Sequence, residues 1–312
     1  MEESVLVTGG AGFIGSHIVD YLIEKGNDVF VVDDLSRGKQ ENINGLAQFY
    51  ELELDASAVD ILEERLPWDE IDIIIHEAAQ IDVGSSLEEP VFDAQNNILN
   101  TIALLELARK HGVRKFIYAS SAAVYGNPDS SLLPLAETVE VDPLSPYGIS
   151  KHTVEHYLKV YKEQYGLEYN VLRYSNVYGP RQDAKGEGGV VSIFIDRIIK
   201  GEPPVIHGDG QQTRDFISVF DVARANYQAM VAETSGIYNI STATEVSVNE
   251  LYRILCNVSG LEIEARQEPA RPGDIRRSSL DNSRAIADLG WEPEVDLEEG
   301  LRKTVEYYNN NS

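Results

Sequence analysis

Short hydrophobic runs alternate with longer amphipathic stretches along the first half of the chain. Runs with the length and apolar character of buried strands occur at residues 5–8, 28–32, 49–54, 71–75, 115–119 and 168–173. Between most of them, apolar residues recur at helical spacing, at about residues 13–25, 58–66, 96–111 and 147–165. This order predicts an α/β fold with a doubly wound parallel sheet and right-handed crossovers.

The regular alternation ends after about residue 175. A helix is expected at residues 190–200, followed by a turn at 201–204 and by loops that contain Gly, Asp and Arg. We therefore expect residues 1–175 to hold most of the sheet, with later segments returning to it. Residues 176–312 are expected to form mainly a smaller C-terminal lobe.

Composition excludes several classes of protein. The 312 residues are 43% hydrophobic, and no apolar run reaches the roughly 18 residues that a membrane span needs. Residues 1–4 lack the basic segment of a signal peptide, so none is expected. Cys256 is the only cysteine, which rules out an intrachain disulfide and a cysteine metal cluster. These features fit a cytoplasmic protein without a membrane partner or a metal.

The chain is strongly acidic, with a formal net charge of −26 from 52 acidic and 26 basic residues. This balance argues against nucleic acid as a partner, because phosphate binding requires a basic surface. Two interpretations stay open. The protein is either an ordinary acidic cytoplasmic protein, or it is adapted to a salty interior in which salt screens the repulsion between carboxylates.

A glycine-rich turn joins the first predicted strand to the first predicted helix. Gly9, Gly12 and Gly15 satisfy Gly-x-x-Gly-x-x-Gly, and Gly10 begins an overlapping Gly-x-Gly-x-x-Gly. Such glycines allow a tight turn and let a pyrophosphate approach the backbone, while the helix N-terminus supplies amide donors. A plain turn can be as rich in glycine, but the position between strand and helix favours a dinucleotide site.

Acidic residues follow the second and third strands. A carboxylate at Asp33 or Asp34, about 20 residues past the glycines, is placed to bind adenosine ribose hydroxyls and would repel a 2′-phosphate. NAD is therefore favoured over NADP, with Arg37 as the reservation because an Arg nearby can accommodate that phosphate. Asp55 could bond the adenine amino group, cap the next helix, or do both.

Small and polar residues follow the fourth and fifth strands, at the edge where open parallel sheets bind ligands. Residues 78–80 leave room for a cofactor close to the backbone. His76 fits a hydrogen-bonded structural histidine better than a catalytic one. A hydroxyl from the serine pair 120–121 could bond a substrate oxygen, although paired serines also simply end strands.

Tyr147 and Lys151 are four residues apart on a predicted helix that Ser145 would cap and Gly166 would end. Both side chains then share one helix face. Because an ammonium group favours a nearby phenolate, we expect Lys151 to lower the pKa of Tyr147 and to make it an acid/base. The bare pair also occurs by chance on solvated helix faces, and the upstream motifs favour the catalytic interpretation.

Isolated arginines lie in loops of the C-terminal third. Arg214 stands in the sequence TRD at residues 213–215, and Arg271 in RPGD at residues 271–274. In a chain this acidic, each could bind an anion bidentately or form a surface salt bridge.

Together and in this order, the motifs are similar to those of the extended short-chain dehydrogenase/reductase superfamily. The chain resembles its UDP-galactose (UDP-glucose) 4-epimerase group over essentially its whole length. The resemblance rests on the segments TGGAGFIG (8–15), HEAAQ (76–80), SSAAVYG (120–126), YGISK (147–151), TRD (213–215) and RPGD (271–274). The resemblance implies a Rossmann fold, bound NAD and a UDP-sugar substrate. It also implies a homodimer in which helices at about residues 91–111 and 147–165 form a four-helix bundle.

The resemblance also assigns roles to residues. Tyr147 would be the acid/base, Lys151 would hold the nicotinamide ribose, and Ser121 would bond the reacting sugar oxygen. The NAD site would comprise Gly9, Gly12, Phe13, Ile14, Gly15, Asp33, Asp34, Leu35, Ser36, Arg37, Gly38, Asp55, Ala56, Ala78, Ala79, Gln80, Asn96, Tyr147, Lys151 and Tyr174. The substrate site would comprise Ser121, Tyr147, Asn176, Val190, Val205, His207, Arg214, Arg271, Asp274 and Ser278.

The implied reaction inverts C4 of a UDP-hexose. Removal of hydride from C4 requires a cofactor as acceptor and a base on the hydroxyl, and return of the hydride to the other face of a rotated 4-keto sugar regenerates NAD. A 4,6-dehydratase or a UDP-glucuronate decarboxylase fits less well, because those enzymes carry acidic residues where this chain has Ala122 and Ala123. UDP-glucuronate 4-epimerase is a further alternative. So is a non-catalytic NAD-sensing protein, although such proteins usually lose the Tyr or the Lys.

One position in this group governs substrate breadth. It lies four residues beyond the Asp of Arg-x-Gly-Asp, where a Tyr restricts the pocket to plain hexoses and a small residue admits an N-acetyl group. Counting from Asp274, that position is Ser278. We therefore expect the N-acetylated UDP-hexoses to be accepted together with the plain pair. A shift of one residue would place Arg277 or Ser279 there instead.

Overall fold

The computed structural model describes residues 3–184, 189–270 and 275–311. At its centre is a seven-stranded sheet in the order β11-β6-β5-β4-β1-β2-β3, with every neighbouring pair parallel. The strands are β1 (Ser4–Thr8), β2 (Asp28–Asp33), β3 (Gln48–Glu51), β4 (Ile73–His76), β5 (Lys115–Ser121), β6 (Glu168–Tyr174) and β11 (Gly236–Ile240). The predicted doubly wound parallel sheet is confirmed, and β11 returns to it from the C-terminal part of the chain.

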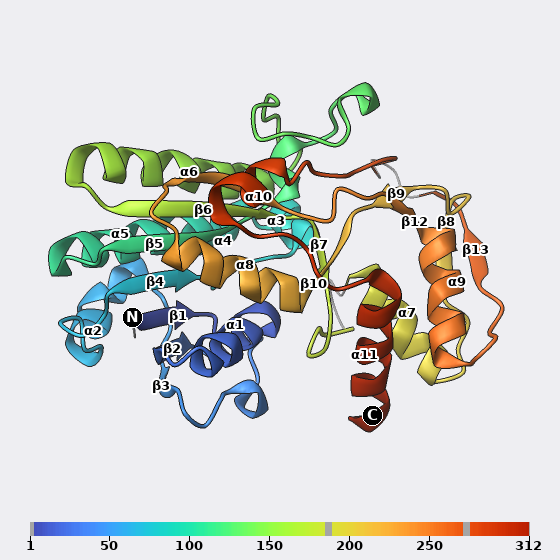
Figure 1. Ribbon diagram of the computed structural model, residues 1–312, viewed down its shortest axis with the longest axis horizontal. Coiled ribbons are helices and arrows are strands. Elements are labelled where there is room, and N and C mark those ends of the chain that lie inside the picture. The colour runs from blue at the N-terminus through green and yellow to red at the C-terminus, as the bar shows by residue number, and fades with distance from the viewer. Residues whose placement is uncertain (1–2, 185–188, 271–274, 312) are drawn as a thin grey trace.

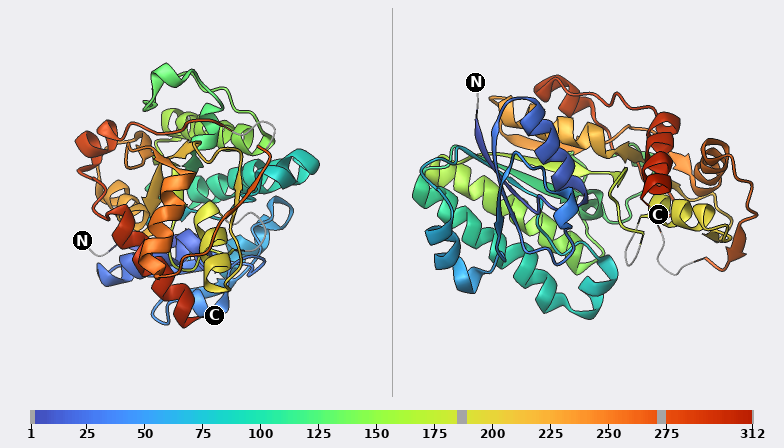
Figure 2. Two further views of the ribbon diagram at one scale, coloured as in Figure 1. Left: turned by 90° about the vertical axis from the view of Figure 1, so that its right-hand side faces the viewer. Right: turned by 90° about the horizontal axis from the view of Figure 1, so that it is seen from below.

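Helices cover both faces of this sheet (Figures 1 and 2). On one face lie α1 (Phe13–Glu24), α8 (Val219–Val231) and α10 (Ser283–Leu289). On the other lie α2 (Val59–Arg65), α5 (Asn100–His111) and α6 (Pro146–Tyr165). Each layer buries its own continuous hydrophobic core against the sheet. None of the helices in the described part of the chain is both long and apolar enough to cross a bilayer.

The helix α6 begins and ends where local signals in the sequence predict. The Ser145 hydroxyl accepts a hydrogen bond from the Gly148 amide at 3.2 Å, and Pro146 is the first helical residue. Gly166 ends the helix with a φ of +76°, which only glycine adopts at little cost.

Two predicted boundaries were wrong. The edge strand β3 pairs with β2 only as far as Glu51. The helix expected from residue 96 begins earlier, because Pro90 opens a short helix. It comprises α4 (Pro90–Ala94), a π-helical turn η3 (Gln95–Leu99) and α5. The apolar periodicity missed this start because Val91 and Phe92, in the first turn, are exposed, whereas the start at about residue 91 that the resemblance implied is close to the observed one.

The remaining elements form a smaller lobe against the carboxyl end of the sheet, on the right in Figure 1. Three two-stranded pairs are β7 (Asn176–Tyr178) with β10 (Phe216–Ser218), β8 (Val205–His207) with β13 (Arg266–Glu268), and β9 (Thr213–Arg214) with β12 (Val246–Ser247). Its helices are α7 (Val190–Ile199), α9 (Val248–Ser259) and α11 (Leu297–Asn310), which share a separate hydrophobic core. Short elements elsewhere are η1 (Gln40–Asn42), η2 (Ala56–Ala58), α3 (Val83–Glu88), η4 (Ala122–Tyr125) and η5 (Ser130–Leu132).

The order of the strands reverses between β1 and β4, which lie side by side with Thr8 opposite His76. From β1 the chain proceeds outward through β2 and β3, and from β4 it proceeds the other way through β5 and β6. Open α/β sheets bind ligands in the crevice at such a switch point, outside the carboxyl ends of the strands. The glycine-rich turn, residues 76–80 and residues 120–126 all lie at the carboxyl ends of strands β1, β4 and β5.

Candidate active site

The glycine-rich turn after β1 is packed too tightly for larger side chains. Gly9 has a φ of +69°, and a Cβ on Gly15 would lie 2.2 Å from the Gly9 carbonyl oxygen. Gly12 precedes α1, and no side chain of the described residues caps that helix. An uncapped helix N-terminus beside a turn without side chains is suited to a bound anion.

The acidic turn after β2 folds back onto the glycine-rich turn. The Asp33 carboxylate accepts hydrogen bonds from the Ala11 amide at 3.0 Å and from the Leu35 amide at 2.8 Å. A Cβ on Gly38 would lie 2.5 Å from Asp33 Oδ1, so the turn is closed around this carboxylate. Each of its oxygens can accept a second bond, as from a ribose hydroxyl. Arg37 is exposed on the same turn.

Of the two uses considered for Asp55, the structure shows the capping one. Its carboxylate accepts bonds from the Ser57 amide at 2.8 Å and from the Ser57 hydroxyl at 2.7 Å, and these bonds lower its pKa. The cap belongs to the short turn η2. We had expected it to belong to the helix that follows, which is α2. Next to it, the Ala56 amide donates to Asn100 Oδ1 at 2.9 Å.

His76 is a structural histidine, as expected. Its Nδ1 lies 2.7 Å from Thr8 Oγ1 and its Nε2 lies 2.9 Å from Thr101 Oγ1. Burial lowers the pKa of His76 to about 3, so the ring is neutral at physiological pH. With both nitrogens engaged, the ring joins β1 and β4 to α5.

The segment after β4 is fixed by an asparagine that the sequence analysis missed. Asn97 is buried, and its Oδ1 accepts from the Gln80 amide at 2.8 Å. Its Nδ2 donates to the Gln80 carbonyl at 2.9 Å and to Ser150 Oγ on α6 at 3.1 Å. The predicted residue Asn96 instead donates to the Phe92 carbonyl within its own helix. The available sequence signal was a cluster of amide side chains, at residues 95, 96, 97 and 100, at the start of the predicted helix.

Ser121, Tyr147 and Lys151 come together at the ends of β5 and α6. Lys151 Nζ donates to the Ala119 carbonyl at 2.8 Å and lies 5.8 Å from the centroid of the Tyr147 ring. A hydrogen bond with Ser121 lowers the pKa of Tyr147, but burial outweighs it and raises that pKa to about 12. The lowering that we expected from Lys151 is therefore not seen. Ser120 points elsewhere, since its hydroxyl donates to Glu155 at 2.7 Å.

Lys151 shares its positive charge with two carboxylates. Burial lowers the pKa of Lys151 to about 8, while Glu77 and Asp93 act in the opposite direction. The Glu77 carboxylate also accepts a hydrogen bond from the Tyr174 hydroxyl at 2.7 Å. Tyr174 was predicted for the cofactor site, whereas Glu77 was given no role. Its position at the end of a parallel strand was the available signal.

Comparison with known proteins places the chain in a family. Residues 5–241 match the model of the NAD dependent epimerase/dehydratase family. The chain belongs to this family. The expected resemblance is thereby confirmed, and NAD is the cofactor by which the family is described.

Three solved structures show how similar the whole fold is. UDP-glucose 4-epimerase of Thermotoga maritima with UDP-glucose is 46% identical, with a TM-score of 0.94 over 99% of both chains. UDP-glucose 4-epimerase of Thermus thermophilus with NAD is 41% identical, with a TM-score of 0.91 over 99% of this chain and 100% of that one. UDP-N-acetylglucosamine 4-epimerase of Methanobrevibacter ruminantium, in complex with UDP-N-acetylmuramic acid, is 37% identical, with a TM-score of 0.92 over 100% of both.

The residues of this family member fit the cofactor. The glycine-rich turn excludes side chains where a pyrophosphate would pass, and Ala78 and Ala79 present only methyl groups after β4. Both alanines are half-buried, as are Ser121 and Tyr147. Half-buried small and polar groups around a switch point can line a nucleotide crevice.

Apart from Ser121 and Tyr147, the predicted substrate residues that the structure describes lie in the smaller lobe or at its border. Asn176 is exposed at the start of β7, and Ser278 is half-buried between exposed Arg277 and buried Ser279. Arg214 Nη1 donates to the Thr213 carbonyl at 2.8 Å and to the Ile275 carbonyl at 2.7 Å. Val190, the first residue of α7, is half-buried, and so are Val205 and His207 in β8. Arg271 and Asp274 lie outside the described residues.

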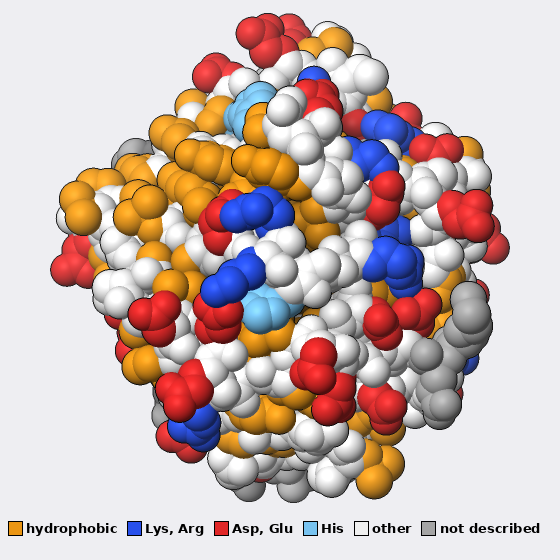
Figure 3. Space-filling view, turned by 90° about the vertical axis from the view of Figure 1, so that its left-hand side faces the viewer, with side chains coloured by type: hydrophobic (Ala, Val, Ile, Leu, Met, Phe, Trp, Pro, Cys, Tyr) orange, Lys and Arg blue, Asp and Glu red, His pale blue; other side chains and the backbone are white. Residues whose placement is uncertain are grey.

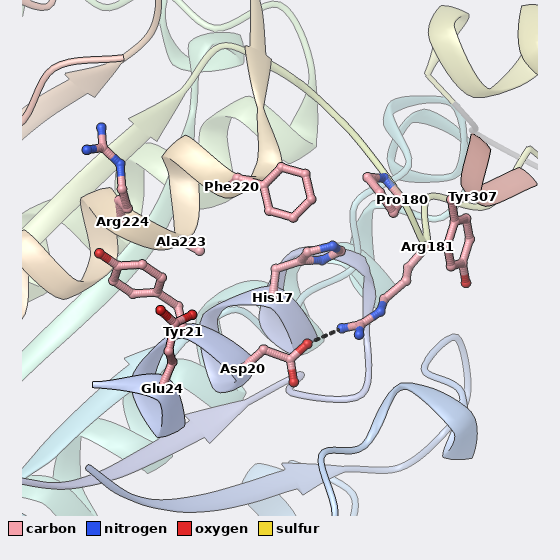
Figure 4. A pocket seen from close by; sticks show the side chains of 10 residues that line it. All are labelled: His17, Asp20, Tyr21, Glu24, Pro180, Arg181, Phe220, Ala223, Arg224 and Tyr307. Carbon is pink, nitrogen blue, oxygen red and sulfur yellow. Dashed lines mark ion pairs between the residues drawn. The ribbon is translucent and has the colours of Figure 1, made fainter. Parts of the chain in front are cut away.

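A separate hollow lies between α1, α8 and the smaller lobe (Figure 4). An ion pair of 2.8 Å between Arg181 and Asp20 spans it. Its lining residues are His17, Asp20, Tyr21, Glu24, Pro180, Arg181, Phe220, Ala223, Arg224 and Tyr307. None of the predicted catalytic, cofactor or substrate residues is among them, so this hollow is a seam between the two parts of the molecule.

Proposed function

We propose that the protein is a UDP-glucose 4-epimerase with bound NAD. The observation that carries the proposal is the meeting of Ser121, Tyr147 and Lys151 at the switch point, beside a turn in which side chains do not fit. Similarity to proteins named UDP-glucose 4-epimerase over 99% of the chain supports it. In this proposal residues 1–175 hold NAD and residues 176–312 mainly hold the UDP-sugar.

The proposed chemistry gives each of the three residues one task. NAD, when bound, supplies the hydride acceptor for sugar C4 and a positive ring near the phenol. Tyr147 takes the proton of the C4 hydroxyl and later returns it, and Ser121 bonds the same oxygen. With a pKa raised to about 12, Tyr147 is protonated at neutral pH, and as a base it needs more positive charge nearby than the protein alone provides. Lys151 is the nearby cation that can turn from Ala119 toward it.

The proposed substrate contacts follow from charge and position. Arg214 and Arg271, with Asn176, would neutralise the diphosphate, because guanidinium groups bind phosphate oxygens bidentately. Val190, Val205, His207 and Asp274 would surround the uridine. Ser278 would leave room at sugar C2, so the N-acetylated pair is included in the proposal. A UDP-N-acetylglucosamine 4-epimerase with 37% identity over the whole chain supports this breadth.

A homodimer through α4, α5 and α6 is also proposed. Apolar side chains on α4, on the adjoining turn η3 and on α6 are exposed, among them Val91 (81%), Phe92 (53%), Leu99 (47%) and Val160 (48%). Hydrophobic side chains also gather on the face that includes the ends of α5 and α6, toward the upper left of Figure 3. Contiguous apolar surface of this kind is typical of a face that a second copy covers.

Product analysis tests the proposed activity. The purified protein is incubated separately with UDP-glucose, UDP-N-acetylglucosamine and UDP-glucuronate, and the products are identified. UDP-galactose from UDP-glucose is the expected product. Exclusive conversion of UDP-glucuronate, by epimerisation or by decarboxylation, would replace the proposal with one of the alternatives.

The variant Tyr147→Phe tests the proposed acid/base. It should keep the fold and bound NAD but lose at least about a hundredfold in kcat, the lower range for acid/base catalysis. The matched control is Tyr21→Phe on α1, a half-buried tyrosine in ring contact with Tyr227 and away from the candidate site, and this variant should turn over at the wild-type rate. Near wild-type turnover of Tyr147→Phe would remove this residue from the mechanism.

A further inference from the structure

Glu77 is an acidic residue to which the proposed reaction gives no task. It follows the last residue of β4 and directly precedes Ala78 and Ala79, at the switch point of the sheet. Its side chain is half-buried. A carboxylate in that position loses much of its hydration and depends on protein partners or on a ligand of opposite charge.

The Glu77 carboxyl is held in place by a short relay of hydrogen bonds. The Tyr174 hydroxyl, at the end of β6, donates to Glu77 Oε1 at 2.7 Å. That hydroxyl in turn accepts a bond from Asn226 Nδ2 on α8 at 2.8 Å. Tyr174 and Asn226 are both buried, so β6 and α8 together fix the position of this carboxyl.

Among the charged groups that interact around Glu77, negative charges outnumber positive ones. From α6, the Lys151 ammonium attracts the carboxylate, and from α4, Asp93 competes for the same ammonium. The hydroxyls of Tyr147, Tyr118 and Tyr174 are neutral, and the charge of Glu77 helps to keep the pKa of each raised. Two carboxyls thus share one ammonium. Burial raises the pKa of Glu77 to about 7, although Tyr174 and Lys151 act in the opposite direction.

An oxidised nicotinamide ring carries one positive charge and a reduced ring carries none. Next to an excess of carboxylate, the oxidised ring is the favoured form, because its charge completes the balance. When the ring accepts a hydride, both electrons and the hydrogen go to the ring and its positive charge disappears. The neighbouring carboxylate then loses a partner, and binding a proton restores neutrality.

We propose that Glu77 couples its own protonation to the oxidation state of bound NAD. It is a carboxylate while the ring is oxidised, and it takes up one proton from solvent when the ring is reduced. Return of the hydride to the sugar releases that proton. Glu77 acts through Tyr174 and Lys151 as a positioning residue, and it favours return of the hydride over accumulation of the reduced enzyme. The inference rests on the proposed function, since it requires NAD in this crevice.

The reduction potential of bound NAD as a function of pH tests the coupling. The holoenzyme is equilibrated with redox couples of known potential, and the reduced fraction is read from the absorbance of NADH. Two-electron reduction of NAD consumes one proton, which gives a slope of about 30 mV per pH unit, since tenfold corresponds to about 30 mV. A second proton at Glu77 should double that slope to about 60 mV near neutral pH.

Three variants sharpen the test. Glu77→Gln keeps the shape of the side chain and should return the slope to about 30 mV per pH unit. Tyr174→Phe removes the donor that favours the carboxylate, so the steep region should move to higher pH. Glu306→Gln, an exposed residue on α11, should leave the wild-type slope. A purely structural role for Glu77 would change the NAD content but not the slope.

A wild-type slope of about 30 mV per pH unit across neutral pH would overturn the inference without reference to any variant. Equal slopes in wild type and Glu77→Gln would overturn it as well, and in either case the proposed epimerase function would stand. If the purified protein instead binds no NAD, the proposed function fails and this inference fails with it.

Discussion

At the scale of single residues, His76 and Tyr147 show how bonding capacity separates structural from reactive groups. His76 is the last residue of β4, and Tyr147 lies in the first turn of α6, at the same carboxyl edge of the sheet. The His76 ring is bonded at both nitrogens and is buried. Tyr147 is half-buried, and within the described part of the chain its hydroxyl pairs with that of Ser121, which has bonding capacity left. A ligand can therefore reach Tyr147, whereas His76 serves the fold.

The burial of His76 predicts a loss of stability in mild acid. The pKa of its ring is lowered to about 3 in the folded protein, against a value of 6.5 when unfolded. Between these values the unfolded state binds one proton more than the folded state, so stability falls as pH falls below about 6.5. Near pH 5 this histidine should contribute a slope of about 1.4 kcal/mol per pH unit to the free energy of unfolding.

Urea unfolding of wild type and His76→Gln between about pH 5 and pH 8 measures this contribution. The variant should be less stable at every pH, but its stability should depend less steeply on pH between about 5 and 6.5. Parallel curves over that interval would show that His76 is not the source of the acid sensitivity.

Ser278 is the residue on which substrate breadth is expected to depend. A Tyr introduced there would fill the space that an acetamido group needs, so Ser278→Tyr should suppress turnover of the N-acetylated UDP-hexoses and spare the plain pair. The measurement is the ratio of the two kcat/KM values. Ser278→Ala, which keeps the position small, is the matched control and should keep the wild-type ratio. If Ser278→Tyr also keeps that ratio, another residue governs breadth.

At the scale of elements, α6 carries three polar residues on one face, of which the second and third are buried. Tyr147, Lys151 and Glu155 follow one another at four-residue spacing, and the last of them anchors the helix. Glu155 accepts bonds from Arg173 Nε at 2.9 Å and Nη2 at 2.6 Å, and from Ser120 at 2.7 Å. Glu155 thus links α6 to β5 and β6. These bonds fix the position of α6 along the sheet, and with it the position of Tyr147 relative to Ser121.

Breaking this buried pair should be costly. The side chains of Arg173 and Glu155 are each 2% exposed, so Glu155→Gln would leave a guanidinium buried without its counter-charge. We expect a loss of about 3–5 kcal/mol in the free energy of unfolding. The control on the same helix is Glu163→Gln, whose pair with Lys159 is exposed and should be worth at most about 1 kcal/mol. Similar losses in the two variants, measured by denaturant unfolding, would contradict this account.

Elements with local signals could be predicted from the sequence. Ser145, Pro146 and Gly166 set the ends of α6 through bonds and dihedral angles within a few residues of each other, so reading them needs no tertiary information. The rule that parallel strands end at one edge also placed the predicted motifs correctly around the switch point. The fold and the location of the candidate site were therefore accessible.

Features that depend on distant partners were not accessible. Arg173 read only as a strand residue, because its carboxylate partner is 18 positions away and on a different element. The pKa of Tyr147 was expected to be lowered, since helical spacing reveals the neighbouring ammonium but not the burial that raises this pKa. Asn97 and Glu77 were missed for the same reason, because each contacts an element that is remote in the sequence.

At the scale of the whole molecule, a strongly acidic surface surrounds an apolar area that a monomer would leave in water. The net charge of −26 repels other copies at low salt, so any contact between copies must form where carboxylates are few. The exposed apolar residues of α4 and α6 provide such a place, and these two helices pack side by side.

We predict that the protein is a dimer and that one substitution on α6 dissociates the dimer into monomers. In a two-fold interface each residue occurs twice, so Val160→Glu would introduce two carboxylates into a closed apolar contact. Val160 is 48% exposed and makes no part of the buried core, so the variant should fold as wild type does. Light scattering at micromolar concentration should give the dimer mass for wild type and the monomer mass for Val160→Glu. Leu261→Glu, at an apolar residue just beyond α9 that is 42% exposed, should remain dimeric and control for added charge. A monomeric wild type, or a dimeric Val160→Glu with unchanged affinity, would exclude this face as the interface.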